Sequence, residues 1–566
     1  MYKLIGNNDT SNVVKTILNN RGVDDADRYL NLSKDDIEDY RDLDNIDDAV
    51  SCFDKHFEKK DKIGILVDTD PDGVCSATIM FKYIKHLDSE YPVYLILHKN
   101  NKSHGLADED FDIEDDTKLI ITPDSSTNDI DICNSLVDNG IDIIIADHHE
   151  KSDKRESSAI ILNNQTSDRY YNKNACGAHI TWDFVRALDN YYWTEYNEVC
   201  LDLVALANIS DNMNITSMST RATINIGLSN INNIMFNEII KAQEFSIKGI
   251  IIPHTISFSV TPLINAFLRL ATYEERALLM KAFCEIDDEV FEYTKRGEVF
   301  PIEENIYEHT IRLCKSYQGK QTRMRDKALP ILMREAQQQY NNKIVILNTS
   351  EVIDKSLNGL VAIKMSDALN KPVLLGKNVK NGNFGGSGRN FDDSPVENLR
   401  DTLAQCPYCI MSQGHPSAHG FEISDIDETI KWFNEKLSDV DMEKIYRCDF
   451  DINIDELDVG FIKDIDDAKW LFGTGLKEPK TIIKNICVNK DDIYICGKNF
   501  DTICFEIDGI KFVQFKVSNG DLLYDYMNSW EETDDIIIFD AIVECELNEY
   551  KGVVTPQCKI INCEVE

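Results

Sequence analysis

Residues 64–77 read GILVDTDPDGVCSA, an apolar strand followed at once by the carboxylates Asp68, Asp70 and Asp72. An EF-hand loop begins with the same spacing, but it follows a helix and ends in a Glu at its twelfth position, where this chain has Ile79. A calcium loop of that type is therefore excluded. Three carboxylates within five residues repel one another unless a cation compensates them, which favours a metal site over a solvated acidic turn.

The apolar run before Asp68 is the first of five short runs, at residues 63–67, 93–97, 119–122, 141–146 and 159–162. Two of the later runs also end in polar clusters. Because the five runs alternate with helical patterns, they predict βαβ units and a parallel sheet whose strand ends share one ligand-binding edge. Asp124 follows the third run, and Asp147, His148 and His149 follow the fourth. Taken singly, Asp124 is explained as a helix N-cap and the histidines as a surface pair; taken together, they predict one site.

A fourth carboxylate, Asp211, ends the apolar helical pattern LDLVALANISD at residues 201–211. By itself it is equally well explained as a helix-terminal Asp. Carboxylate and imidazole ligands without nearby thiolates suit manganese or magnesium better than structural zinc. A ligand set of this size fits two divalent ions bridged by a carboxylate, the arrangement that serves phosphoryl transfer.

Composition limits the class of protein. The 566 residues, which suggest three or four domains, include 59 basic and 99 acidic side chains, for a net charge of −40. No apolar run approaches the roughly 18 residues of a membrane span, the N-terminus lacks a signal-peptide pattern, and the cysteines follow no framework spacing. We therefore expect a cytoplasmic protein. The acidity does not exclude a nucleic-acid enzyme, because nucleic-acid binding depends on the local electrostatic field of a groove. A protein that mimics DNA is also compatible with this charge.

One segment reverses the sign of the charge. Residues 312–334 carry seven basic side chains, Arg323 and Arg325 among them, against the single acid Asp326. Charge runs are usually solvated helical faces. The position of this run, between two α/β patterns, favours a path that tracks phosphates instead.

The ordered motifs resemble a known superfamily. DTDPDG (68–73), PDSS (123–126), ADHHE (146–150) and ALANISD (205–211) are similar to the four motifs of the DHH phosphoesterases. Three later stretches resemble the DHH-associated domain, namely residues 358–375, FGGSGRNF (384–391) and QGHPSAHGFEI (413–423). SVTPLINAFLRL (259–270) and FGTGLKEP (472–479) resemble segments of RecJ-type exonucleases. The chain is thus identified as RecJ-like over most of its length.

The resemblance and the periodicity together imply an α/β architecture. The expected parts are an N-terminal helical segment (1–60), a parallel-sheet DHH domain (61–216), a helical connector (217–335), a smaller α/β DHH-associated substrate-binding domain (336–437) and a C-terminal OB-like (oligonucleotide-binding) β-barrel (438–566). Short alternating runs in the last part predict a small antiparallel barrel or sandwich.

The resemblance also implies roles for individual residues. Asp68 or Asp70 would help hold the first metal, Asp72, His148 and Asp211 the second, and Asp124 would bridge the two. His149 would contact the scissile phosphate, and Asp147 would orient its neighbours. Ser387, Arg389, Gly414 and His415 would bind phosphate or the nucleic-acid end, and Asn265 and Arg269 would line the path of the strand. The chain departs from the family at Ser125–Ser126, at Gln413, and in having no His ligand before Asp68.

The function implied is a metal-dependent exonuclease that hydrolyses single-stranded DNA from the 5′ end and releases nucleotides. Its cofactors would be two divalent ions, manganese in preference to magnesium. Its partners would be single-stranded DNA and a single-stranded-DNA-binding protein or helicase. No membrane partner is expected. One alternative is a phosphodiesterase for short oligoribonucleotides or cyclic dinucleotides, although such substrates do not need the connector or the terminal domain. A non-catalytic scaffold is the other, although it would be expected to lose metal ligands first.

Overall fold

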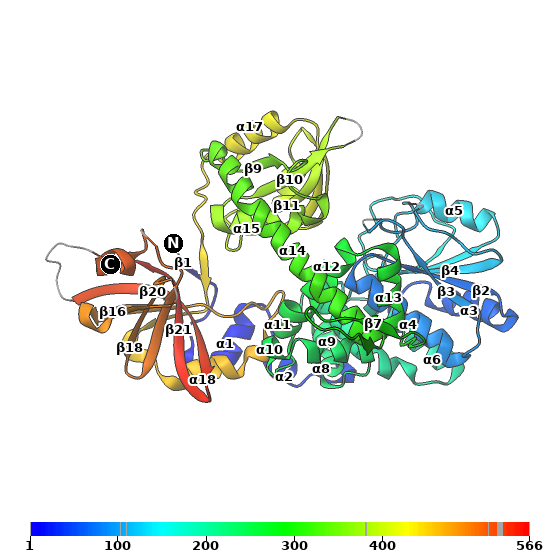
Figure 1. The fold of residues 1–566 in the computed structure, drawn as a ribbon, viewed down its shortest axis with the longest axis horizontal. Helices are drawn as coiled ribbons and strands as arrows, with labels where there is room; N and C mark the ends of the chain where they lie inside the picture. The colour runs from blue at the N-terminus through cyan, green and yellow to red at the C-terminus, as the bar shows by residue number, and fades with distance from the viewer. Residues whose placement is uncertain are drawn as a thin grey trace. The chain divides into compact units, whose positions relative to one another are not determined.

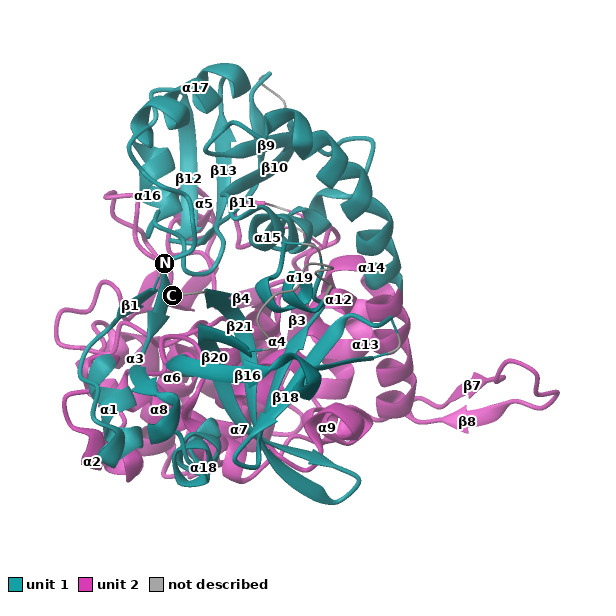
Figure 2. Cartoon of the chain, turned by 90° about the vertical axis from the view of Figure 1, so that its left-hand side faces the viewer, with its two compact units in different colours: residues 1–20, 320–469, 478–566 teal, residues 21–319, 470–477 magenta. Residues whose placement is uncertain are grey.

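The protein is described by a computed structural model that covers residues 2–101, 103–108, 110–379, 382–497, 499–518, 520–528 and 536–564. The chain forms two compact units, coloured separately in Figure 2. Unit 1 comprises residues 1–20, 320–469 and 478–566, and unit 2 comprises residues 21–319 and 470–477. None of the helices in these described ranges combines the length and apolar character needed to cross a lipid bilayer.

Unit 2 contains the predicted parallel sheet, in the strand order β3-β2-β4-β5-β6. Its strands are β2 (Lys62–Val67), β3 (Val93–Leu97), β4 (Thr117–Pro123), β5 (Asp142–Asp147) and β6 (Ile160–Asn163), and every pairing between them is parallel. Apolar side chains such as Leu66, Ile96 and Ile143 form the core on one face. The prediction of a mixed α/β chain built on a parallel sheet is confirmed.

Helices surround this sheet and carry part of the site. They are α3 (Ile46–Lys59), α4 (Pro71–Leu87), α5 (Ile130–Asp138), α6 (Gly177–Tyr192) and α7 (Leu201–Ser210). Helix α4 begins at Pro71, directly after Asp70. The reason is local: Asp70 accepts a 2.9 Å hydrogen bond from the Gly73 N–H, and Pro71 occupies the first helical position, where it is favoured. Asp70 and Asp72 therefore belong to a helix start and not to an open turn.

The segment after the sheet is largely helical, as the periodicity predicted. It contains α8 (Met218–Ser229), α9 (Ile234–Ala242), α10 (Glu244–Ile247), α11 (Pro253–Thr255), a π-turn (Ile256–Val260), α12 (Thr261–Leu270), α13 (Tyr273–Phe283) and α14 (Ile306–Ala336). An antiparallel hairpin, β7 (Phe291–Tyr293) with β8 (Ile302–Glu304), interrupts it and was not predicted. The division between the two units falls within α14, between residues 319 and 320 (Figure 2).

The first part of unit 1 is a five-stranded mixed sheet in the order β12-β13-β11-β10-β9. Its elements are β9 (Val345–Asn348), α15 (Asn358–Leu369), β10 (Val373–Asn378), β11 (Phe384–Arg389), α16 (Leu399–Ala404), β12 (Cys409–His415), β13 (Ala418–Ile423) and α17 (Ile426–Lys436). Strands β9 and β10 are parallel, and the others pair antiparallel. Two apolar clusters cover the two faces, one with residues of α15 and one with residues of α16 and α17.

The rest of unit 1 is a seven-stranded sheet in the order β15-β16-β20-β21-β19-β18-β17. Its strands are β15 (Phe450–Asn453), β16 (Thr481–Asn489), β17 (Tyr494–Cys496), β18 (Thr502–Ile507), β19 (Ile510–Phe515), β20 (Ile536–Tyr550) and β21 (Val553–Glu564). The two end strands, β15 and β17, do not pair with each other in the described residues, so the sheet is not the closed barrel that the sequence predicted. Alternating runs indicate strands but not which distant strands pair, because pairing depends on contacts far apart in the chain. Strand β1 (Tyr2–Leu4) adds a small parallel pair with β14 (Tyr446–Cys448).

Candidate metal centre

The carboxyl ends of the parallel strands in unit 2 bring the predicted metal residues together. Asp68 follows β2, Asp124 follows β4, Asp147 ends β5, and Asp211 ends α7 as its C-cap residue. Three overlapping groups have potential ligand atoms that lie within 4.8 Å of one another. They are Asp68 with Asp70 and Asp124; Asp72 with His148 and Asp211; and Asp124 with Asp147, His148 and His149.

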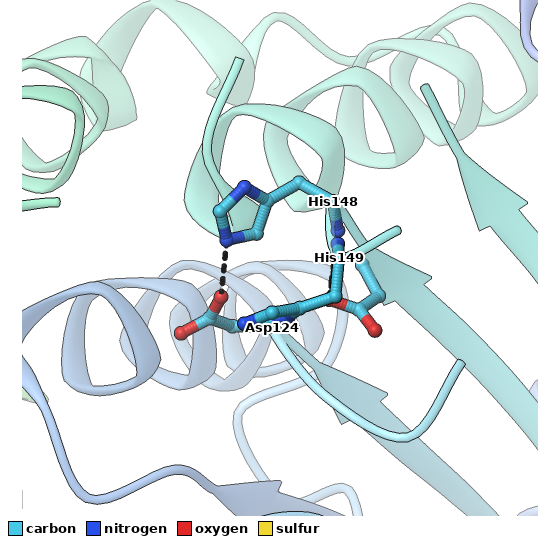
Figure 3. A group of neighbouring side chains, drawn as sticks. Asp124, His148 and His149 are labelled. Atoms are coloured by element: carbon cyan, nitrogen blue, oxygen red, sulfur yellow. Dashed lines mark hydrogen bonds and ion pairs between the residues drawn. The ribbon is translucent and has the colours of Figure 1, made fainter. Parts of the chain in front are cut away.

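His148 lies at the centre of these groups. Its Nε2 atom is 3.3 Å from Oδ1 of Asp124, 3.5 Å from Oδ2 of Asp211 and 3.9 Å from Oδ2 of Asp72. Figure 3 shows the imidazole of His148 directed at Asp124, while His149 extends from the neighbouring position. One imidazole nitrogen therefore faces three carboxylates that come from three different turns of the chain.

Asp124 owes its position to an unusual backbone. Its φ is +62°, a left-handed conformation, and its N–H donates a 2.8 Å hydrogen bond to the Ala146 carbonyl. A Cβ atom on Gly177 would lie 2.4 Å from the Cβ of Asp124, so only glycine there allows α6 to approach this closely. The interpretation of Asp124 as a helix N-cap is wrong, because α5 begins after Asp129 instead.

Asp72 links the cluster to α6. Its Oδ2 accepts a 2.8 Å hydrogen bond from the Gly177 N–H, and its Oδ1 accepts another of 2.8 Å from the Ala178 N–H. Both donors belong to the first turn of α6, where backbone N–H groups have no partner within the helix. Asp72 thus holds this helix against the site, while its Oδ2 also faces His148.

The cluster is electrostatically unfavourable as a set of bare carboxylates. Burial, reinforced by neighbouring carboxylates, raises the pKa values of Asp124 and Asp211 well above their usual range. Burial together with the charges of Asp68 and Asp72 raises the pKa of Asp70 to about 6. Within the described residues, three buried carboxylate oxygens accept no hydrogen bond, and all belong to this cluster: Oδ1 of Asp68, Oδ1 of Asp124 and Oδ2 of Asp211. Unsatisfied anionic oxygens beside an imidazole fit hard divalent cations.

Asp147 and His149 form a hydrogen-bonded pair at the rim. Oδ1 of Asp147 accepts hydrogen bonds from the His148 N–H at 2.7 Å and the His149 N–H at 3.2 Å, and it lies 2.7 Å from Nδ1 of His149. The pKa of Asp147 is lowered, because these contacts outweigh the effect of burial. Burial acts to lower the pKa of His149, but the Asp147 carboxylate outweighs it and raises that pKa to about 9.

The structure adds one residue that was not predicted, His104, in the loop after β3. Its Nδ1 lies 2.8 Å from Oδ2 of Asp68, and its ring centroid is 5.2 Å from that of His149. The Asp68 carboxylate raises the pKa of His104 to about 10. A signal was present in the sequence, because the run at 93–97 ends on the same sheet edge as the run before Asp68.

Two further predicted residues lie on α12. Asn265 and Arg269 are one helical turn apart and half-buried. Burial lowers the pKa of the Arg269 guanidinium, and the charge of Asp70 partly offsets that effect. Arg269 is therefore electrostatically linked to the carboxylates.

The predicted phosphate-binding residues Ser387, Arg389, Gly414 and His415 lie in unit 1. Ser387 and Arg389 are on β11, paired with Gly420 and Ala418 of β13, and Gly414 and His415 end β12. Gly359 permits the Arg389 guanidinium to pack on the first turn of α15, since a Cβ there would lie 2.4 Å from Nη2.

His419, which was not predicted as a site residue, lies beside these residues on β13. It is buried, and within the described residues neither of its ring nitrogens makes a hydrogen bond. Its ring occupies space that a side chain on Gly388 would need, with Nε2 2.6 Å from where a Cβ would be. Burial, helped by Arg389 and Arg400, lowers the pKa of His419 to about 4.

Two arginines of the basic run of α14 form ion pairs within the chain. Arg312 forms a 2.9 Å ion pair with Glu304, and Arg325 forms a 2.7 Å ion pair with Asp326. Arg323 is exposed. The prediction that this run, Arg323 and Arg325 included, tracks phosphates stays a prediction.

Comparison with known proteins identifies relatives for the whole chain. Residues 62–208 match the model of the DHH family, N-terminal domain. The chain is 33% identical to the SPbeta prophage-derived protein YorK of Bacillus subtilis (strain 168), which carries the provisional name single-strand DNA-specific exonuclease, over 100% of this chain and 98% of the relative. It is 23% identical to the single-stranded-DNA-specific exonuclease RecJ of the same organism, over 86% of this chain and 60% of that protein.

Solved structures share the fold. RecJ from Thermus thermophilus in complex with Mn²⁺ matches with a TM-score of 0.69 and 17% identity, covering 93% of this chain and 72% of that one. The Mg²⁺ complex of the same protein matches with a TM-score of 0.63 and 16% identity, covering 93% of this chain and 70% of that one.

Proposed function

The chain belongs to the RecJ-like branch of the DHH superfamily, and on this basis we propose that it is a metal-dependent exonuclease that hydrolyses single-stranded DNA. The proposed enzyme releases nucleotides from the 5′ end by hydrolysing one phosphodiester bond at a time. Single-stranded DNA is the proposed substrate, in keeping with the names of the relatives. A single-stranded-DNA-binding protein or helicase remains the expected protein partner.

The observation that carries the proposal is the set of carboxylates and His148 at one sheet edge. Asp68 or Asp70 would help hold one divalent ion, Asp72, His148 and Asp211 the other, and Asp124 would be shared between them. Divalent ions held by these residues would supply an activated water and would offset the negative charge that develops on the phosphate. Manganese is the proposed ion and magnesium the alternative, because both are found with RecJ of the same fold.

The chain's own side chains position the phosphate. Asp147 holds His149 by its Nδ1 and keeps it protonated, so that His149 presents a cationic N–H donor to the phosphate at neutral pH. Arg269 offers a second positive charge next to Asp70. We propose that His149 and Arg269 both bind the scissile phosphate and hold it in one orientation.

Unit 1 is proposed to bind the rest of the substrate. Ser387, Arg389, Gly414 and His415 supply donors and close backbone approach for a terminal phosphate. Arg323 and Arg325 on α14 are proposed to contact the backbone of the strand. The C-terminal β-rich segment retains its proposed role as an OB-like binding domain, although its sheet is open. The five domain ranges expected from the sequence are retained as a proposal.

The test is a time course with Mn²⁺ on two single strands, one labelled at its 5′ end and one at its 3′ end. The protein is compared with Asp124→Asn and with the control Asp131→Asn, which changes an exposed carboxylate on α5. The expected result is immediate release of labelled mononucleotide from the 5′ end, lost in Asp124→Asn and kept in Asp131→Asn. If neither strand is shortened while both are bound, the protein is a scaffold and the proposal is wrong.

A further inference from the structure

The helical stretch 253–270, which ends near Arg269, contains a widened turn. It runs from α11 through the π-turn Ile256–Val260 into α12 (Figure 1). The N–H of Thr261 donates to the carbonyl of Ile256, five residues back. Pro262 follows and has no N–H to offer to the carbonyl of residue 258, which explains why an ordinary α-helical turn does not form here. Such π-turns are frequent at functional sites.

This turn presents an aromatic pair to solvent. Phe258 is 70% exposed, and its ring stacks on that of His254 with centroids 4.5 Å apart and planes at 24°. Its neighbours Ile256, Ser259 and Val260 are buried and attach the turn to unit 2. The Phe258 ring is thus held in place by His254 and by the buried residues of the turn.

The aromatic pair precedes a stripe of accessible residues on α12. Pro262, Asn265 and Arg269 follow the helical spacing i, i+3 and i+7, and like the exposed Phe258 before them they are not fully buried. Arg269, at the far end of this stripe, interacts with Asp70 of the carboxylate cluster. The stripe therefore runs from Arg269, past Asn265, towards Phe258.

We propose that Phe258, backed by His254, is a stacking platform for a base of the bound strand. The inference rests on the proposed function and extends it to a subsite that lies along α12. Eleven helical residues span about 16 Å, which equals about five nucleotides at the 3.4 Å spacing of a duplex strand and fewer in an extended one. The base on Phe258 is therefore a few nucleotides from the scissile phosphate.

The chemistry of the stripe favours a single strand over an apolar protein partner. A cationic and an amide side chain that follow an exposed aromatic ring along the chain suit phosphates and bases, whereas a docking peptide helix needs a continuous apolar face. Stacking on an aromatic ring does not depend on base identity, because every base has a π-face. The subsite should hold DNA without selecting its sequence.

The experiment measures equilibrium binding of the full chain in EDTA, so that cleavage cannot interfere. Fluorescence anisotropy is recorded with a ten-nucleotide oligothymidine and with a ten-nucleotide strand of the same phosphates that lacks bases in its interior. The variants are Phe258→Ala, Phe258→Trp and the control Phe245→Ala, which removes another exposed ring of unit 2, 94% exposed on α10. Thermal unfolding of each variant reports any loss of folding.

We expect Phe258→Ala to weaken binding of oligothymidine about tenfold and binding of the abasic strand far less. Phe258→Trp should restore affinity, and Phe245→Ala should not change it. An equal loss on both strands, or unchanged binding in Phe258→Ala, would overturn the platform. If the unchanged protein binds neither strand, both the platform and the proposed substrate fail; if it binds but never cleaves with Mn²⁺, only the proposed exonuclease activity fails.

Discussion

Nδ1 of His104 lies 2.8 Å from Oδ2 of Asp68, whereas Oδ1 of Asp68 is buried and accepts no hydrogen bond among the described residues. The loop after β3 thus orients one oxygen of a carboxylate that β2 positions, and the other oxygen is available to the proposed cation. Partners of this kind orient metal ligands and typically change metal affinity by ten- to a hundredfold.

His104→Ala should therefore weaken Mn²⁺ binding by about tenfold, because Asp68 loses the contact that orients it. Isothermal titration calorimetry measures this without any substrate. His86→Ala, an exposed histidine of α4, is the control and should bind Mn²⁺ like the unchanged protein. Equal affinities for all three proteins would show that Asp68 does not need His104.

Asp124→Asn should separate stability from activity. Burial and neighbouring carboxylates raise the pKa of Asp124, so removing its charge relieves repulsion in the metal-free protein. We expect the Tm in EDTA to rise by a few degrees and the hydrolysis rate with Mn²⁺ to fall by more than about a hundredfold. Calorimetric scans and initial rates measure the two effects. A lower Tm in EDTA would mean that the carboxylate stabilises the fold.

Gly177→Ala should weaken metal binding, although Gly177 is not itself a proposed metal ligand. The added Cβ would lie 2.4 Å from the Cβ and Oδ1 of Asp124, so Asp124 or the start of α6 must shift. We expect weaker Mn²⁺ binding and a loss of stability of about 1–3 kcal/mol. Gly460→Ala, also in the first turn of a helix but near only the Asp458 side chain, should be nearly neutral. Normal metal affinity in Gly177→Ala would contradict this packing argument.

Arg389→Lys should reduce the preference for a 5′-phosphate. A guanidinium forms two parallel hydrogen bonds to a phosphate, whereas an ammonium acts as a point charge. We expect kcat/KM to fall about tenfold on 5′-phosphorylated strands and less on 5′-hydroxyl strands, in steady-state assays with both. Arg447→Lys alters an exposed ion pair with Glu397 and serves as the control. An equal loss of kcat/KM on both strands would show that Arg389 does not recognise the 5′-phosphate.

His419 should make unit 1 sensitive to acid. The folded protein holds the pKa of His419 at about 4, below its usual 6.5, through burial beside Arg389 and Arg400, with Asp401 acting weakly in the opposite direction. As the pH falls from 6.5 to 4, the unfolded chain binds a proton that the folded chain does not, so stability is lost, by about 3 kcal/mol in total. Urea unfolding of wild type and His419→Asn across this range measures the difference. Parallel pH profiles would show that His419 does not titrate in this way.

Several outcomes depended on contacts between distant parts of the chain. Neither His104 nor His419 was predicted as a site residue, because their contacts arise from the shared sheet edge and from the β11–β13 pairing. The open order of the seven-stranded sheet and the β7–β8 hairpin were missed for the same reason. Alternating apolar residues indicate that a segment is a strand, but strand pairing is decided by packing across the whole unit.

The sequence by itself determined the parallel strands, the carboxylates that follow them and the resemblance to the DHH superfamily. These features are local, because strand length, turn chemistry and the carboxyl-end rule need only neighbouring residues. The tertiary structure alone decided that one nitrogen of His148 faces Asp72, Asp124 and Asp211. It also decided that Gly177 admits Asp124 at close range, because such contacts join residues far apart in the chain that only a packed core brings together.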